Sequence, residues 1–224
     1  MVEFTPPAPE NRHPRCPCVL VLDSSGSMAG EPIEKLNAAV ATLPDEMRSD
    51  KLAVRRVEIA IVSFPPVQTA QPFATVEAFV PPKLVADGLT PLGAAVTHAL
   101  HLIEERKTAY RAQHLEWFRP WLFLVTDGAP NDDDDWRAAA AAVRSAEADN
   151  KLAFFAVGVP GANVDVLAQF SGRRPPLKLV DLRFREMIQW LTRSVQAVSQ
   201  SAAHTGGDSN ASVPLPGVVG WGEL

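Results

Sequence analysis

One short stretch limits the fold more than any other part of the sequence: an apolar run from Val19 to Leu22 that ends at Asp23. Four consecutive apolar residues are too few for a helix, and the two valines favour a strand buried on both faces, as in the centre of a parallel sheet. The pattern returns at Trp121-Leu-Phe-Leu-Val-Thr-Asp127, where a second apolar run ends at an aspartate. Both runs therefore predict central strands that end at a carboxylate.

Strand-like and helix-like segments alternate along the rest of the chain. Further buried strands are predicted at residues 57–64, 152–159 and 177–181, and a short antiparallel edge strand at 75–80. Apolar residues at helical spacing predict helices within 30–47, 92–113, 136–150, 164–170 and 185–199. This alternation predicts an α/β fold, Rossmann-like and doubly wound, with a mostly parallel central sheet, one antiparallel edge strand and helices on both faces.

The 224 residues are enough for one domain with a sizeable core. We expect an extension at 1–15, the domain at 16–200, and at 201–224 a tail rich in Gly, Ser and Pro without a core of its own. A net charge of −5 argues against a nucleic-acid surface. No apolar run approaches the roughly 20 residues of a membrane span, and no secretory signal is visible. We therefore expect a cytoplasmic protein without nucleic-acid or membrane partners.

Oxygen-bearing side chains follow the two aspartate-ended strands and one further turn. Ser25 and Ser27 come directly after Asp23, with a glycine between them that permits a tight backbone. Thr90 precedes a proline at a predicted helix start, which places its hydroxyl about where an N-cap would be. Ligands of open parallel sheets bind beyond the carboxyl ends of strands. If the strands are neighbours, these side chains and Asp127 converge on one spot.

Five oxygen donors without a thiol or an imidazole suit Mg²⁺ or Mn²⁺ rather than zinc. Three of the five are neutral hydroxyls, so the two aspartates neutralise the charge of the ion only in part. Taken singly, each residue has a plainer interpretation, because Ser and Thr are common in turns and Asp commonly caps helices. Taken together, they predict a metal site.

The same residues resemble the metal-ion-dependent adhesion site of von Willebrand factor A (VWA) domains. The matching pieces are Asp23-Ser-Ser-Gly-Ser27, Thr90 in Leu-Thr-Pro-Leu-Gly, and Asp127 in Val-Thr-Asp-Gly, in the order and spacing of that family. The resemblance covers about residues 16–200. It implies that Ser25, Ser27 and Thr90 ligate the ion directly, that one or both aspartates act through water, and that a Glu or Asp of a partner protein completes the shell.

The resemblance further implies a non-enzymatic adaptor that recognises an acidic side chain of another protein through the metal. Gly26, Met28 and Gly128 lie beside the motif residues and are expected to contact the partner.

A closer resemblance is to bacterial tellurium-resistance (TerY-type) VWA proteins. It is carried by Ser-Gly-Ser-Met-x-Gly-Glu-Pro-Ile-Glu at residues 25–34 and by Val-Thr-Asp-Gly-Ala-Pro-Asn-Asp around Asp127. Those proteins are cytoplasmic and are associated with stress-response modules that include a protein kinase and a PP2C-type phosphatase. The resemblance therefore implies a similar setting and similar partners here.

Two other functional classes stay open. A Mg²⁺-dependent hydrolase or phosphatase would need a nucleophile or base beside the metal. After Asp23 the chain continues Ser-Ser-Gly, with no second carboxylate there, and no Gly-x-x-x-x-Gly-Lys loop is present. The third class, a VWA subunit that partners an AAA-type ATPase, rests on analogy of fold alone.

Other chemically suggestive residues have ordinary structural interpretations. Cys16 and Cys18 supply half of a zinc site at most and are expected to be reduced and partly buried. The acidic run 132–135 is a candidate second cation site, but helix capping is the preferred interpretation. His98 and His101 share a helix face without a third ligand near in sequence, so zinc is not expected there.

Two aromatic stretches complete the candidates. The stretch at residues 116–121 leads into a strand, and its aromatic side chains are expected to pack in the core. In the tail, residues 213–216 (Val-Pro-Leu-Pro) and Trp221 are either a linear docking element or a segment folded back over a groove.

Overall fold

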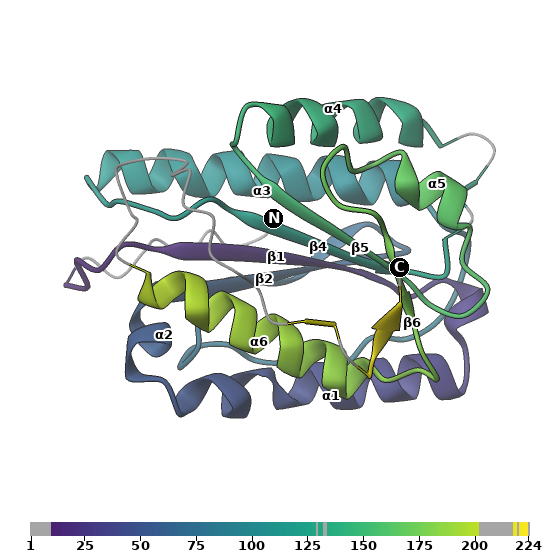
Figure 1. Cartoon of the computed structure of the whole chain (residues 1–224), viewed down its shortest axis with the longest axis horizontal. Coiled ribbons are helices and arrows are strands. Elements are labelled where there is room, and N and C mark those ends of the chain that lie inside the picture. The colour runs from purple at the N-terminus through teal and green to yellow at the C-terminus, as the bar shows by residue number, and fades with distance from the viewer. Residues whose placement is uncertain (1–9, 129, 132–133, 202–216, 219, 224) are drawn as a thin grey trace.

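The computed structural model describes residues 10–128, 130–131, 134–201, 217–218 and 220–223 (Figure 1). In chain order the elements are β1 (Cys16–Asp23), the short 3-10 helix η1 (Gly26–Met28), α1 (Glu31–Arg48), α2 (Lys51–Arg56), β2 (Val57–Phe64), β3 (Gln68–Thr75), α3 (Leu92–Ala112), β4 (Trp121–Thr126), α4 (Trp136–Ala148), β5 (Ala153–Gly158), α5 (Val164–Ala168), β6 (Leu177–Leu179), α6 (Phe184–Gln200) and β7 (Gly222–Glu223).

A single sheet organises the described part of the chain, with strand order β3-β2-β1-β4-β5-β6-β7. The five inner strands run parallel, while β3 and β7 pair antiparallel to their neighbours at the two edges. The predicted doubly wound, mostly parallel fold is confirmed, and the second antiparallel edge is an addition. The chain passes from β1 to β2 on one side and from β4 to β5 on the other. The switch point of the sheet therefore lies between β1 and β4.

Both faces of the sheet are covered by helices, α1, α2 and α6 on one and α3, α4 and α5 on the other (Figure 1). The residues of β1 alternate between the two cores: Leu20 and Leu22 face the first layer, and Val19 and Val21 the second. All four side chains are fully buried. A continuous apolar run is what a strand covered on both faces requires, which is why β1 could be recognised from its sequence.

The edge strand differs from the prediction: it is formed by Gln68–Thr75, and residues 76–80 lie outside any strand. Only a three-residue turn separates β2 from β3, so the antiparallel pair closes a short loop at little entropic cost. Half of its residues are polar, as suits a partly exposed edge strand. Val76 and Phe79, which suggested a strand, instead pack as buried loop side chains in the core beside α1.

At the amino end of the sheet a buried carboxylate is held by cationic side chains. Glu58 on β2 is fully buried; its Oε2 accepts hydrogen bonds from Nε of Arg106 (2.8 Å) and the hydroxyl of Tyr110 (2.5 Å). Its Oε1 lies 3.2 Å from Nε of Arg15, which is also buried. Because a buried charge is costly unless it is paired, this cluster ties β2, α3 and the segment before β1 together.

The tail contributes to the fold at its last described residues. Trp221 is 1% exposed, its ring centroid lies 5.4 Å from that of Trp190 on α6, and its carbonyl accepts a hydrogen bond from the N–H of Val180 (2.9 Å). A guanidinium N–H of Arg183 donates to the carbonyl of Gly220 (2.6 Å). Trp221 is therefore part of a segment folded back onto the core, whereas residues 213–216 lie outside the described residues.

We expect Trp221→Ala to lower the free energy of unfolding by about 3 kcal/mol, because burial of a large aromatic side chain is lost and a cavity is left beside Trp190. Urea unfolding followed by circular dichroism measures the change. Glu223→Ala, at an exposed position two residues further along the chain, is the control. A loss below about 1 kcal/mol for Trp221→Ala would contradict this packing.

Candidate functional site

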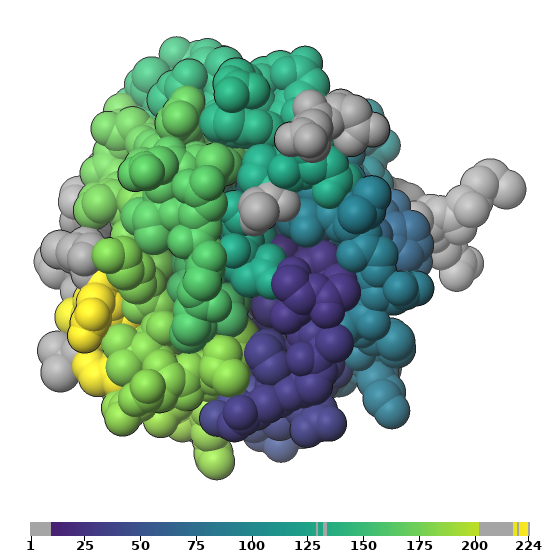
Figure 2. All heavy atoms as spheres, turned by 90° about the vertical axis from the view of Figure 1, so that its right-hand side faces the viewer, coloured from purple at the N-terminus to yellow at the C-terminus, as the bar shows by residue number. Residues whose placement is uncertain are grey.

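The two aspartate-ended strands are neighbours, as the convergence of the predicted ligands requires. Strands β1 and β4 pair in parallel, with Leu22 opposite Val125, so Asp23 and Asp127 leave the same edge of the sheet at the switch point. Figure 2 shows this face, where the segment after β1 (purple) adjoins the segments before α3 (blue) and after β4 (teal). The fold thus brings the three predicted turns to one place.

Asp23 is fully buried and its carboxylate is held from two sides. The backbone N–H of Ser25 donates to Oδ1 (2.8 Å), which bends the chain directly after β1. The hydroxyl of Thr126, the last residue of β4, donates to Oδ2 (2.5 Å). These two hydrogen bonds fix the carboxylate between the strand ends.

Burial raises the pKa of Asp23 above the usual value of 3.8, and the negative charge of Asp127 raises it further. The hydrogen bonds from Thr126 and Ser25 act against this rise because they favour the charged form. Burial has the largest effect, so the ionised carboxylate is less stable in the fold than in water. A cation beside Asp23 would remove this penalty.

The hydroxyls of Ser25 and Ser27 lie 3.0 Å apart on the turn after β1. Ser25 is buried and Ser27, within η1, is exposed, so the pair reaches from the carboxylate to the surface. Gly26 is also exposed and accessible to a partner. Met28 is fully buried in the core, so its prediction as a partner contact is wrong; its apolar side chain instead anchors η1.

Thr90 is held in place by the segment that follows β4. Its N–H donates to the side-chain oxygen of Asn131 (2.9 Å), and the N–H of Asn131 donates back to the carbonyl of Thr90 (3.2 Å). Two residues earlier, the carbonyl of Gly88 accepts a hydrogen bond from the N–H of Gly26 (3.0 Å). The loop that carries Thr90 is therefore tied both to the turn after β1 and to the segment after β4.

Thr90 does not cap α3, in contrast to the sequence-based expectation. The helix begins at Leu92, and its first N–H groups are capped from another segment: those of Gly93 and Ala94 donate to the carboxylate of Asp134 (2.6 and 3.2 Å). This close approach requires glycine, because a Cβ at Gly93 would lie 2.6 Å from the backbone of Trp136.

The acidic run has the capping role that was preferred for it, at the residues the structure describes. Asp134 caps α3, and Asp135 caps α4 by accepting a hydrogen bond from the N–H of Ala138 (3.3 Å). Residues 132–133 of the run lie outside the described residues.

Two residues that shape the site were not singled out from the sequence: Thr126 and Asn131. The hydroxyl of Thr126 also accepts a hydrogen bond from the N–H of Gly128 (2.8 Å), so it links the Asp23 carboxylate to the turn that carries Asp127. Gly128 is buried and has a φ of 77°, a conformation that favours glycine. A threonine directly before the strand-ending aspartate is the signal that could have identified this support.

The residues present fit a hard divalent cation. All the candidate donors are oxygens, from the carboxylates of Asp23 and Asp127 and the hydroxyls of Ser25, Ser27 and Thr90, and such sets select Mg²⁺ or Mn²⁺. No group of three or more His, Cys, Asp or Glu side chains with metal-binding geometry occurs within the described residues. The site formed by the two aspartates and the three hydroxyls is therefore the remaining candidate for metal binding.

The remaining sequence candidates are structural. Cys16 and Cys18 are free and buried, and burial raises the pKa of Cys16 to about 12, so that thiol stays protonated at neutral pH. His98 forms a 2.8 Å hydrogen bond with the hydroxyl of Thr69 on β3. In the stretch before β4, the aromatic side chains are buried as expected: Trp117, Phe118 and Trp121.

This combination of sheet order, switch-point aspartates and serine-rich turn defines a class of protein, the VWA domains. The sequence model of the von Willebrand factor type A domain matches residues 18–178, more than half of the chain. The chain belongs to this family. A comparison with characterised proteins by sequence found no match.

Solved structures with the same fold include a thread matrix protein and a pilus adhesin. Proximal thread matrix protein 1 from the mussel byssus is 16% identical, with a TM-score of 0.57 over 83% of this chain and 49% of its own. Pilus adhesin SpaC from Lactobacillus rhamnosus GG is 11% identical, with a TM-score of 0.64 over 84% of this chain and 32% of its own. The chain thus spans about half the length of the first and a third of the second, and at these identities the likeness shows the fold alone.

In the absence of divalent cations, the stability of Asp23→Asn relative to wild type should rise as the pH increases from about 4 to about 7. The folded-state pKa of Asp23 is raised, so the wild type loses stability as the pH rises from 3.8 through the folded value, and the amide has no such loss. Urea unfolding in chelator across this range measures the difference. A constant difference would contradict the raised pKa.

The isosteric change Thr126→Val should weaken Mn²⁺ binding about tenfold, because the Asp23 carboxylate loses the hydroxyl that orients it. Calorimetric titration with Mn²⁺ measures the affinity. Thr69→Val, which removes the hydroxyl bonded to His98 away from the site, is the matched control and should leave the affinity unchanged. Equal affinities for all three proteins would show that Thr126 does not support a metal site.

Proposed function

We propose that this chain is a divalent-cation-dependent protein-interaction module that binds an acidic side chain of a partner through Mg²⁺ or Mn²⁺. The observation that carries the proposal is the arrangement around Asp23: a buried carboxylate whose pKa is raised by burial, with the charge of Asp127 beside it and hydroxyls that lead to the surface. When bound, the cation neutralises both carboxylates and supplies an electrophilic position for an incoming ligand.

In this proposal the five site residues have two different roles. Ser25, Ser27 and Thr90 hold the ion, and Asp23 and Asp127 balance its charge directly or through water. The neutral hydroxyls leave the ion electrophilic, so a carboxylate from another protein is the ligand that completes the shell most favourably. Partner binding then depends on metal occupancy.

The comparisons support an interaction role of this kind. The relatives in this fold include a pilus adhesin and a mussel byssus protein, and one structure of the latter is described as having a zinc-occupied MIDAS motif, the metal-ion-dependent adhesion site. A metal-dependent adaptor, rather than an enzyme, is the function we assign to this chain.

The setting we propose is a bacterial stress-response assembly in the cytoplasm, of the kind associated with tellurium resistance. The support for this setting is the closeness of residues 25–34 and of the Val-Thr-Asp-Gly-Ala-Pro-Asn-Asp stretch to TerY-type proteins. A protein kinase or a PP2C-type phosphatase would then be the partner that supplies the Glu or Asp. Within the part of the chain that the structure describes, none of the helices has the length and apolar character needed to cross a bilayer.

Capture of partners from an extract of the source cells, with Mg²⁺ and with chelator, tests the proposal. We expect wild type to retain a partner in Mg²⁺ and to release it in chelator, and Asp23→Ala to retain at least tenfold less, because loss of the metal removes the ligand contact. Mass spectrometry of the released fraction identifies the partner class.

The capture experiment has an internal control in Asp135→Ala. This change removes an exposed carboxylate that caps α4 and lies outside the donor set, so it should leave capture unchanged. Chelator-insensitive capture of every partner would overturn metal-mediated recognition. Phosphatase turnover that disappears in Asp23→Ala would instead assign the chain to the hydrolases.

A further inference from the structure

Three large apolar side chains stand out as strongly exposed among the described residues, and all lie in one ten-residue stretch. Val80, Val85 and Leu89 are 68%, 71% and 72% exposed, and Leu89 directly precedes Thr90. A single exposed apolar residue such as Val80 is common, but Val85 and Leu89 lie close in sequence to Thr90 of the polar site and mark an interaction surface. The loop at residues 80–90, which carries the candidate metal ligand Thr90, thus also presents exposed apolar side chains.

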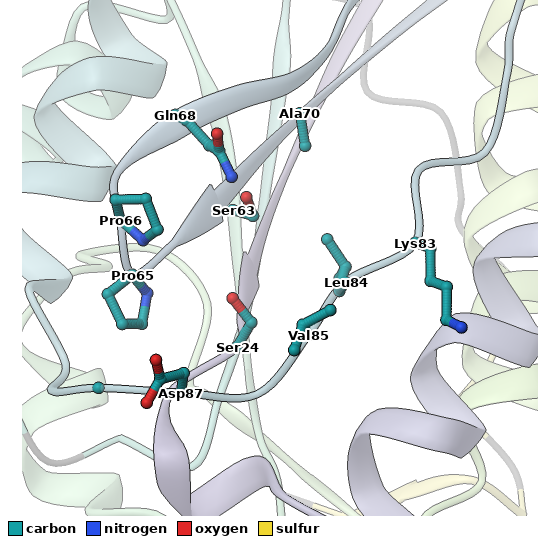
Figure 3. A pocket seen from close by; sticks show the side chains of 11 residues that line it. Ser24, Ser63, Pro65, Pro66, Gln68, Ala70, Lys83, Leu84, Val85 and Asp87 are labelled. Carbon is teal, nitrogen blue, oxygen red and sulfur yellow. The ribbon is translucent and has the colours of Figure 1, made fainter.

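A cavity of about 410 Å³ opens between this loop and the turn that joins β2 to β3 (Figure 3). Its size lies within the range of ligand pockets, about 300–1,000 Å³. Pro65 and Pro66 form one wall, and Leu84 and Val85 the opposite wall. Ala70 on β3 borders the cavity at its upper end in this view. We call this cavity the β2–loop pocket.

The β2–loop pocket and the metal site share their backbone. Ser24, which lines the pocket, lies between Asp23 and Ser25, and its carbonyl accepts a hydrogen bond from the N–H of Asp87 (2.9 Å). Gly88, also in the lining, accepts the hydrogen bond from Gly26 in η1. The pocket therefore adjoins the metal site.

The lining of the pocket favours an apolar side chain. Five of its side chains are apolar, and the hydroxyl of Ser24 already donates to the carbonyl of Phe64 (3.0 Å), which reduces the demand for a polar ligand. The two charged side chains of the lining have opposite signs, with Lys83 at the rim farther from the Pro65–Pro66 wall and Asp87 nearer to Pro65. The acidic residue of the partner is therefore selected by the metal and not by the pocket.

We propose that the β2–loop pocket receives an apolar side chain of the same protein segment whose carboxylate completes the metal shell. This inference rests on the proposed function and specifies its partner: an extended segment with a Glu or Asp and a large apolar residue a short distance away. Because the pocket and the metal site share the backbone at residues 23–26 and 87–88, the two side chains of the segment lie close together in its sequence.

A random peptide library displayed on phage tests this partner chemistry with the full chain immobilised. Selection is carried out in Mg²⁺ and elution with chelator. We expect the eluted peptides to share an acidic residue and, at a fixed spacing from it, a Leu, Ile, Met or Phe.

Two variants test the pocket with one synthetic peptide from this selection. Val85→Ser removes an apolar wall, and Ala70→Phe fills the cavity; each should weaken peptide binding about tenfold while calorimetry shows unchanged Mg²⁺ binding. Val80→Ser is the matched control, because Val80 is as exposed as Val85 but does not line the pocket.

The possible outcomes separate the two proposals. Eluted peptides that share only the acidic residue, or equal losses in Val80→Ser and Val85→Ser, overturn the pocket and leave the metal-dependent function in place. Apolar peptides that bind equally in chelator, or a library that yields no peptide, overturn both. Self-association of the wild type in Mg²⁺ that Val85→Ser abolishes would identify a second copy of the chain as the occupant and overturn the heterologous segment.

Discussion

The arrangement of the candidate site depends on one buried carboxylate, that of Asp23 at the end of β1. A charge in this position is tolerated only if donors surround it. The two donors are the N–H of Ser25, in the turn after β1, and the hydroxyl of Thr126, at the end of β4. The ends of β1 and β4 are therefore joined through a polar contact as well as through the sheet. The like charge of Asp127 beside it leaves a local excess of negative charge that a cation relieves.

The turns around this carboxylate support one another through backbone hydrogen bonds. Gly26 is joined to Gly88, Thr90 to Asn131, and the start of α3 to Asp134. Each bond connects two turns that are far apart in sequence, so no turn moves without affecting another. Such cross-linking holds ligands in position before an ion or a partner arrives, which reduces the cost of ordering them on binding.

The sequence was most informative for strands that are buried on both faces and for side chains that can act as metal ligands. The run 19–22 permits little else than a central strand, and Asp23 and Asp127 mark where two strands end. The edges were less predictable: β3 is a polar strand specified by its short turn with β2, and β7 depends on the packing of Trp221. The capping of α3 by Asp134 was missed for the same reason, because the cap comes from a segment 40 residues away.

The Glu58 cluster shows what distinguishes the two ends of the sheet. Glu58 has its counterions built into the chain, Arg15 and Arg106, whereas Asp23 is met by a neutral hydroxyl and a neutral N–H. Folding thus neutralises the charge of Glu58 within the chain. In the proposed function, the charge of Asp23 would be neutralised by a cation from the surroundings. A fall in the concentration of free divalent cations would then affect only the end of the sheet at Asp23. The ion pairs of Glu58 with Arg15 and Arg106 at the other end would hold the strands in place, so that the site could bind a cation again.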